Sequence, residues 1–337
     1  MAKNLLMISI DRKIFEAGSN VRARQIEYAK SWDEVHIIVA TDRSYKEVHI
    51  APNIWVYPTR SLFKVLYPFD AIRLGKFIAK RKNIQQITCQ DPFLTAMAGV
   101  TLKKELKIPL EIQIHTDIGS PNYTYTLLNK VRKYLALSYL PRADHIRVVS
   151  QRVKDYLMTV IPAKAGIQDF ITVRPIAVDT EWIVNTPIMI DLHHKYPQFE
   201  KIVLMASRLE KEKNIELAIN SWPKILEKIP KAGLIIVGAG SEEASLRKQI
   251  ARCDLEKSVI IEPWAPKQIL ASYYKTADAF LNTSLFEGYG MALVEAKAAG
   301  CLVISTDVGI ANEVGATIIN FDESDVAEKI IKILKSV

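Results

Sequence analysis

The residues best suited to chemistry lie in one stretch, Asn282 to Gly300, which reads NTSLFEGYGMALVEAKAAG. It follows an apolar strand candidate and places two glycines before a segment of helical period, so it predicts a strand, a glycine loop and a helix. The glycines allow the backbone to approach a ligand, and unpaired N–H groups at the start of a helix attract anions. The predicted donor-binding groups of this loop are those of Gly288, Tyr289, Gly290 and Met291.

Two carboxylates accompany this loop. Glu287 precedes the helix and Glu295 falls in its second turn, so they should stand at different depths of one pocket. A carboxylate can accept hydrogen bonds from two neighbouring hydroxyls, which suits one glutamate to a sugar and the other to a ribose. The alternative is that both are solvated residues near a helix end, since charged side chains are mostly exposed.

Two cations lie in a second segment, SRLEKEKNIELAI, just after another strand candidate. Arg208 offers a planar fork for phosphate oxygens, and Lys213 offers a mobile point charge at the start of a helix. Together they could neutralise a departing nucleoside diphosphate. Considered without any other signal, the same pair would be interpreted as ordinary surface charge.

The FEGYG loop, the VEAKAAG helix and the Arg and Lys segment together resemble glycosyltransferase family 4, most strongly over residues 200–313. The resemblance implies that Glu287 contacts the donor sugar, that the loop amides hold the diphosphate and that Glu295 binds ribose. It also implies a GT-B fold and a retaining, metal-independent reaction in which Arg208 and Lys213 stabilise charge. A shorter glycine pattern around Gly309 and a single final helix depart from the family's usual form.

Further site residues follow from the resemblance. His115 ends a strand and would hydrogen-bond the transferred sugar, although a single histidine there could be structural. Gly18 lies in a glycine loop that would admit the acceptor or the phosphates. Gly238 would let the nucleotide lie close, although the dinucleotide fingerprint fails because Glu243 stands where its third glycine belongs. Trp264 would pack near the base or else serve as a core residue.

Two more polar residues follow strand candidates in the first half of the chain. Asp91 and Ser150 should face the same side as His115. Either could instead cap the helix that comes next.

Short apolar runs alternate with segments of helical period along the whole chain, which predicts an α/β protein with parallel sheets. The series restarts near residue 201. We therefore expect two Rossmann-like, doubly wound domains facing each other across a cleft: an acceptor domain over 1–178, a connection over 179–198 and a donor domain over 199–337. The strands expected in the first domain are residues 5–10, 35–40, 54–57, 87–90, 110–115, 145–150 and 171–178; those of the second are 202–206, 234–237, 259–262, 279–282, 302–305 and 317–319.

Composition restricts the class of protein. Of 337 residues, 49% are hydrophobic and 24% charged, which is ordinary globular usage. Three separated cysteines suggest neither a disulfide framework nor a zinc site, and the first apolar run is too short for a signal peptide or a membrane span. We expect a cytoplasmic protein, and a peripheral position on the inner face of the cell membrane is the further expectation.

Charge is unevenly distributed: residues 1–185 carry 27 Lys and Arg against 17 Asp and Glu, whereas residues 186–337 carry 18 against 20. The first half therefore suits an anionic partner. An anionic membrane surface is one interpretation, because five cations share one expected helix with aromatic residues just upstream; a solvated helix beside a packed loop is the other. The five are Arg73, Lys76, Lys80, Arg81 and Lys82.

The sequence lacks a DxD triplet, and it lacks HExxH, GxSxG and Walker lysine motifs, which weighs against GT-A transferases, proteases, hydrolases and ATPases. We expect an enzyme that uses a nucleoside-diphosphate sugar, a glycan or lipid-linked acceptor of the cell envelope, no cofactor and no metal. The alternatives are a sugar-nucleotide epimerase on the same fold and a basic nucleic-acid-binding protein. No nucleic acid is expected, because the chain lacks recognised binding signatures.

Overall fold

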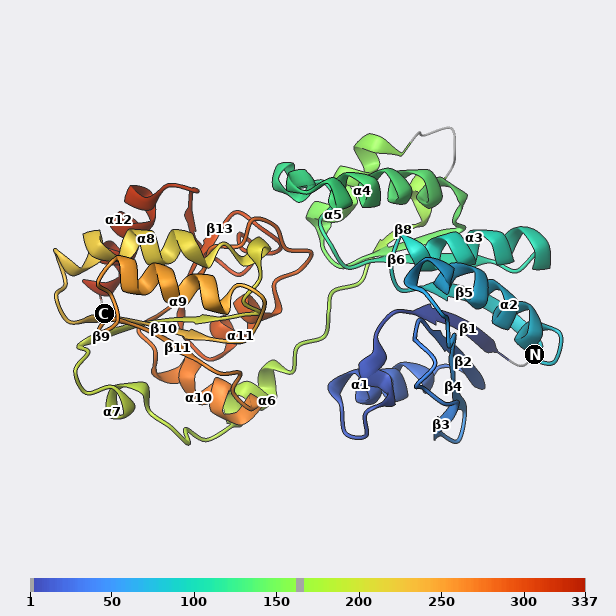
Figure 1. Ribbon diagram of the computed structural model, residues 1–337, viewed down its shortest axis with the longest axis horizontal. Helices are drawn as coiled ribbons and strands as arrows, with labels where there is room; N and C mark the ends of the chain where they lie inside the picture. Colours follow the sequence, from blue (N-terminus) through green and yellow to red (C-terminus); the bar gives the residue numbers. More distant parts are fainter. Residues whose placement is uncertain (1–2, 162–166, 337) are drawn as a thin grey trace. The chain divides into compact units, whose positions relative to one another are not determined.

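A computed structural model describes residues 3–161 and 167–336 of the chain and divides it into two units, residues 1–174 and 175–337. Each unit is built on its own sheet, whose apolar strands alternate with helices (Figure 1). Because strands covered on both faces must be apolar throughout, this arrangement explains the uninterrupted apolar runs in the sequence. The predicted α/β class with two parallel-stranded sheets is confirmed.

The first unit contains an eight-stranded sheet with the order β3-β4-β2-β1-β5-β6-β7-β8, in which every pairing is parallel except that of β3 with β4. The strands are β1 Asn4–Ser9, β2 Glu34–Val39, β3 Val48–Ala51, β4 Ile54–Pro58, β5 Ile84–Cys89, β6 Leu110–Ile114, β7 His145–Val148 and β8 Ile171–Val173. The α-helices are α1 Asn20–Ala29, α2 Tyr67–Ala79, α3 Leu94–Leu106, α4 Leu127–Tyr139 and α5 Gln151–Val160.

The second unit contains a six-stranded, wholly parallel sheet with the order β11-β10-β9-β12-β13-β14. Its strands are β9 Lys201–Ala206, β10 Ala232–Val237, β11 Val259–Glu262, β12 Ala279–Asn282, β13 Leu302–Thr306 and β14 Thr317–Ile319. Its helices are α6 Thr180–Asn185, α7 Leu192–Lys195, α8 Ile215–Leu226, α9 Glu243–Arg252, α10 Lys267–Thr276, α11 Met291–Ala298 and α12 Glu323–Leu334. The order reverses between β9 and β12, and ligands of open α/β sheets bind at such a switch point.

Alternate residues of β9 divide the core of the second unit between two faces. Val203 and Met205 pack with α8, α9 and α12, whereas Ile202 and Leu204 pack with α7, α10 and α11. This period of two follows from the pleat of a strand. The double cover fixes the carboxyl ends of β9 and β12, after which the cation segment and the glycine loop begin.

Three local features differ from the expected elements. Strand β3 was not expected, and β8 ends at Val173 although a strand was expected as far as residue 178. Pro175 explains the early end, because proline has no N–H to donate to a neighbouring strand. The stretch expected to connect the domains, residues 179–198, contains α6 and α7, and Leu192 of α7 belongs to the core of the second unit.

Candidate functional site

The glycine loop between β12 and α11 ends at Gly290, the N-cap residue of α11, with φ of 95°. Glycine adopts this left-handed conformation without strain, and a Cβ there would lie 2.8 Å from Cδ1 of Leu293. Within the described residues, the backbone N–H groups of Tyr289, Gly290 and Met291 donate to no acceptor. They lie at the N-terminal end of a helix and can bind an anion.

Glu287 and Lys213 form an ion pair between Oε1 and Nζ. The hydroxyl of Ser284 donates to the same carboxylate oxygen at 2.8 Å. Both charged side chains are largely buried, with 18% of Glu287 and 15% of Lys213 exposed. A lysine ammonium has three N–H donors and the pair uses one, so two remain for the oxygens of an anion.

Hydrogen bonds between two loops hold Lys213 beside Glu287. The hydroxyl of Thr283 donates to the carbonyls of Lys213 at 3.0 Å and Asn214 at 2.9 Å. The N–H of Leu285 donates to the carbonyl of Glu212 at 2.8 Å. Residues 74 positions apart in sequence are thereby fixed side by side, which predicts a rigid site.

A turn after β13 supports the glycine loop. The N–H of Ile310 donates to the carbonyl of Tyr289 at 2.9 Å, and the hydroxyl of Thr306 donates to the carbonyl of Ser284 at 2.7 Å. Gly309 lies between them with φ of 53°, and a Cβ there would stand 2.2 Å from the Tyr289 carbonyl oxygen. The backbones therefore approach more closely than any side chain at residue 309 would allow.

Glu295 lies on α11 behind the loop. Its carboxylate accepts a hydrogen bond from the hydroxyl of Tyr274 at 3.1 Å, and the Tyr274 side chain is buried. Burial raises the pKa of Glu295 above its usual range, although the Tyr274 hydrogen bond and the charge of Lys267 oppose the shift. A half-buried carboxylate with hydrogen-bonding capacity left can accept from the hydroxyls of a ligand.

Arg208 and Gly238 occupy neighbouring loops after β9 and β10. Arg208 is 67% exposed and pairs with Glu212 at 2.8 Å, so its guanidinium is not in the ion pair with Glu287. A Cβ at Gly238 would lie 1.9 Å from the carbonyl oxygen of Ser207. Gly238 therefore lets the two loops touch, which is a supporting role.

Trp264 follows β11. Its side chain is 56% exposed. It is therefore not a core residue.

His115 lies in the first unit, directly after β6, where its Nε2 is 3.2 Å from Oε1 of Gln113. The residue is exposed, yet nearby protein atoms remove part of the water that would stabilise a charged ring. This desolvation lowers the pKa of His115 to about 4, and the nearby charges of Arg147 and Arg24 contribute in the same direction. The ring is therefore neutral at neutral pH and can donate from one nitrogen while accepting at the other.

The other polar positions of the first unit lie at helix starts. Gly18 has φ of 79°, and the Ser19 hydroxyl after it caps α1 by accepting from the N–H of Arg22 at 3.2 Å. Asp91 accepts from the N–H groups of Phe93 at 2.8 Å and Thr95 at 3.4 Å. Asp91 thus caps the start of α3, the structural alternative that the sequence left open.

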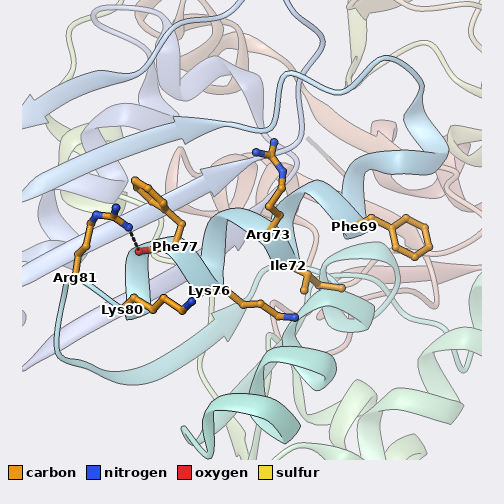
Figure 2. A pocket seen from close by; sticks show the side chains of 7 residues that line it. All are labelled: Phe69, Ile72, Arg73, Lys76, Phe77, Lys80 and Arg81. Carbon is orange, nitrogen blue, oxygen red and sulfur yellow. Dashed lines mark hydrogen bonds between the residues drawn. The ribbon is translucent and has the colours of Figure 1, made fainter.

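A groove of about 550 Å³ lies on α2 and is lined by three aromatic or aliphatic side chains and four cations (Figure 2). Arg81 lies 3.6 Å from the ring centroid of Phe77 and donates to its carbonyl. Lys82, which the sequence grouped with these cations, is instead paired with Glu34 at 3.0 Å. Phe77 is 50% exposed, so the helix presents mixed apolar and basic character to solvent.

Sequence reasoning missed three contributors: Ser284, Tyr274 and Thr306. Each is buried and hydrogen-bonds within the site from a different element. Ser284 and Thr306 follow or end strands, a position typical of site residues in this fold, and that was the one available signal. Tyr274 looks like any aromatic residue of an amphipathic helix.

Within the described residues, no three His, Cys, Asp or Glu side chains are grouped so as to hold a metal ion. No helix in these parts of the chain combines the length and the apolar character required to cross a bilayer.

Two family models match the chain: "Glycosyltransferase Family 4" over residues 27–182 and "Glycosyl transferases group 1" over residues 192–336. Alpha-monoglucosyldiacylglycerol synthase of Streptococcus pneumoniae is 25% identical over 86% of this chain and 67% of its own length. Sucrose-phosphate synthase from Thermosynechococcus elongatus has a TM-score of 0.80 at 20% identity, covering 99% of this chain and 90% of that one. Anabaena HepE in complex with UDP has a TM-score of 0.73 at 18% identity over the same shares.

Proposed function

Because the chain is a glycosyltransferase of family 4 with the GT-B fold, we propose that it moves a sugar from a nucleoside-diphosphate sugar to a lipid-linked or glycan acceptor. We further propose that the reaction retains the anomeric configuration. Two comparisons support these substrate classes. The pneumococcal relative is a synthase of a glycosylated diacylglycerol, and the Anabaena neighbour was solved with UDP.

The observation that carries the proposal is the position of Lys213 and Glu287 beside three unpaired N–H groups. A diphosphate is a polyanion that matches N–H donors at a helix N-terminus together with an ammonium group. The carboxylate of Glu287 would repel phosphate oxygens but can accept from sugar hydroxyls. The site therefore suits a molecule that joins a sugar to a diphosphate.

Each further residue has a proposed part in binding or transfer. Glu295 accepts from the ribose hydroxyls, because it is half-buried and retains acceptor capacity beyond the Tyr274 bond. The exposed ring of Trp264 lies near the base. In the first unit, the neutral imidazole of His115 hydrogen-bonds the transferred sugar, and Gly18 leaves room for the acceptor.

Charge in the transition state is stabilised by this chain's own groups. As the bond to the sugar breaks, negative charge grows on the departing diphosphate, where Lys213 and the loop amides are already in place. Arg208 can leave Glu212 for a phosphate, because that pair is exposed. In the proposed retaining step, the departing phosphate assists removal of the acceptor's proton on the same face of the sugar.

The basic, aromatic surface of α2 supports a peripheral position on an anionic membrane. Phe69 and Phe77 are 55% and 50% exposed beside Arg73, Lys80 and Arg81. Aromatic side chains insert into the headgroup region, while basic ones attract anionic lipids. Binding there would bring the enzyme to a lipid-linked acceptor.

A thermal-shift panel of nucleoside diphosphates and their sugars tests donor binding, because a ligand that binds only the folded state raises its melting temperature. We expect one nucleotide series to stabilise the protein. Lys213→Ala should abolish most of that shift and lower sugar transfer by about 10²-fold or more, as is typical of losing one electrostatic stabiliser.

Lys211→Ala is the matched control, because Lys211 lies on the same turn but is exposed. It should behave as the wild type. Near wild-type transfer by Lys213→Ala would refute the assigned role. Consumption of a nucleotide sugar without any acceptor, with release of an isomeric sugar, would favour an epimerase instead.

A further inference from the structure

Three arginines of the first unit have no hydrogen-bond or ion-pair partner among the described residues. The side chains of Arg24 on α1, Arg147 on β7 and Arg174 after β8 form no ion pair and donate no hydrogen bond within the described residues. Nε of Arg147 is moreover buried. A guanidinium has five N–H donors and stays charged, so a partly buried one without an acceptor is unusual.

Strand register brings two of these arginines to one face of the sheet. Gln113 pairs with Arg147, and Arg147 pairs with Thr172 on the next strand. Residues opposite each other on adjacent strands, and residues two apart on one strand, share a face. Arg174 therefore follows Thr172 on the face that carries Arg147.

Helix α1 brings the third arginine and an aromatic ring to the same place. The guanidinium of Arg174 lies 5.9 Å from the ring centroid of Tyr28. Tyr28 stands on α1 one helical turn after Arg24. Arg147 and Arg24 are both close enough to His115 for their charges to lower its pKa. The arginine cluster, defined as Arg24, Arg147 and Arg174, thus converges beside His115.

The cluster has too little negative charge around it. Glu111 is the carboxylate whose charge acts on Arg147, so one negative charge faces three guanidinium groups. Its Oε1 accepts from the neutral hydroxyl of Thr88 at 2.9 Å and from Nε2 of Gln113 at 3.1 Å, not from an arginine. Arg24 and Arg174 are exposed, and Arg147 is half-buried with a buried, unpaired Nε. An anion entering from the exposed side would be attracted by all three charges and could accept from Arg24, from Arg174 and from the accessible N–H groups of Arg147.

We propose that the arginine cluster binds a phosphate group carried by the acceptor, beside the position of the transferred sugar. This inference rests on the proposed function, which assigns His115 to that sugar. Phosphate fits because its oxygens accept paired N–H bonds from the planar guanidinium fork. The phosphate could belong to a soluble sugar phosphate or to a phospholipid headgroup, which share this chemistry.

Calorimetric titration of the full chain tests the cluster. Wild type should bind glucose 6-phosphate at least tenfold more tightly than glucose, or bind vesicles with 20% phosphatidylglycerol more tightly than phosphatidylcholine vesicles. The first result indicates a soluble acceptor and supports the site. The second indicates a lipid acceptor and supports the site where Arg174→Gln removes the preference; a vesicle preference that Arg174→Gln leaves unchanged belongs to the α2 surface and counts against the site. Equal binding in both comparisons would overturn it.

Variants separate this site from other cationic surfaces. Arg147→Gln and Arg174→Gln should each weaken the preferred binding about tenfold or more, a common result of losing a charge-assisted hydrogen bond. Arg43→Gln, an exposed arginine outside the cluster, should change it less than twofold. If Arg147→Gln fails to fold, Arg24→Gln and Arg174→Gln carry the test because both residues are exposed.

UDP titration distinguishes failure of this inference from failure of the proposed function. All cluster variants should bind UDP as the wild type does, because the donor groups lie in the second unit. Loss of phosphate preference with UDP binding intact would be expected of a true acceptor subsite. If UDP displaces the bound phosphate and the cluster variants do not change phosphate binding, then the phosphate binds at the donor site. That result would overturn the proposal for the arginine cluster.

Discussion

Replacing Gly309 with alanine should disable the proposed donor site through the backbone, without removing any charged group. Gly309 has φ of 53°, and its Cβ would stand 2.2 Å from the Tyr289 carbonyl oxygen and 3.2 Å from Cβ of Glu287. A normal non-bonded contact is about 3.5 Å. The glycine loop would therefore have to move by about 1 Å, away from the turn that supports it.

Two effects contribute to the expected loss. Alanine in the left-handed region costs about 1–2 kcal/mol of stability. A displacement of about 1 Å in a positioning group can lower an enzyme's rate about 10²-fold. We expect Gly309→Ala to lose stability by at least the first amount, to bind UDP more weakly and to transfer sugar about 10²-fold more slowly.

Gly315→Ala is the matched control, because Gly315 also has a positive φ, 71°, but its Cβ would meet nothing within 4 Å. Gly315→Ala introduces the same backbone strain but does not displace the glycine loop. It should therefore lose about 1–2 kcal/mol of stability and keep its UDP affinity and turnover. The assays are denaturant unfolding, UDP calorimetry and initial rates. Equal UDP affinity for the two variants would show that the turn does not set the loop's position.

Three further predictions concern charge. Glu295→Gln should raise the melting temperature at neutral pH, because burial disfavours the ionised carboxyl of Glu295. The same change should weaken UDP binding about 10- to 100-fold, because it removes a charged acceptor. Melting curves measure the first effect and calorimetry the second. The pKa of His115 is about 4 in the folded chain, whereas its ordinary value is 6.5. Between these two pH values only the unfolded chain binds the proton, so the free energy of unfolding should fall as the pH drops from about 6.5 to about 4. Denaturant unfolding of His115→Gln should depend less on pH across that range. Lys80→Gln with Arg81→Gln should weaken binding to anionic vesicles about 30-fold, at about 1 kcal/mol for each charge removed; an unchanged vesicle titration would exclude the α2 surface.

Long apolar runs made the fold predictable. The parallel strands are covered on both faces, so segments such as 202–206 and 234–237 were apolar throughout and their bounds were nearly correct. Strand β3 carries the exposed His49, pairs antiparallel with β4 and lies at the sheet edge, so it lacks that pattern. Its stability depends partly on His49 stacking on Trp55, a contact that no local pattern encodes.

The site was predictable where its residues are neighbours in sequence and less so where they come from separate elements. The glycine loop with Glu287 and Glu295 is one continuous segment. Lys213 was identified as a cation for phosphate, but nothing in its own segment indicated the ion pair with Glu287. Such long-range contacts arise from the strand order of the sheet, which places β9 beside β12.

In the proposed donor site, the pairing of Lys213 with Glu287 would allow one lysine to serve both halves of a sugar nucleotide. The pair is internally neutral, so the largely buried carboxylate has a compensating charge beside it. A bound diphosphate would use the two remaining N–H donors without breaking the pair, and Glu287 would stay oriented toward the sugar. Little reorganisation is then needed when negative charge develops on the departing phosphate, which is the condition under which electrostatic stabilisation is most effective.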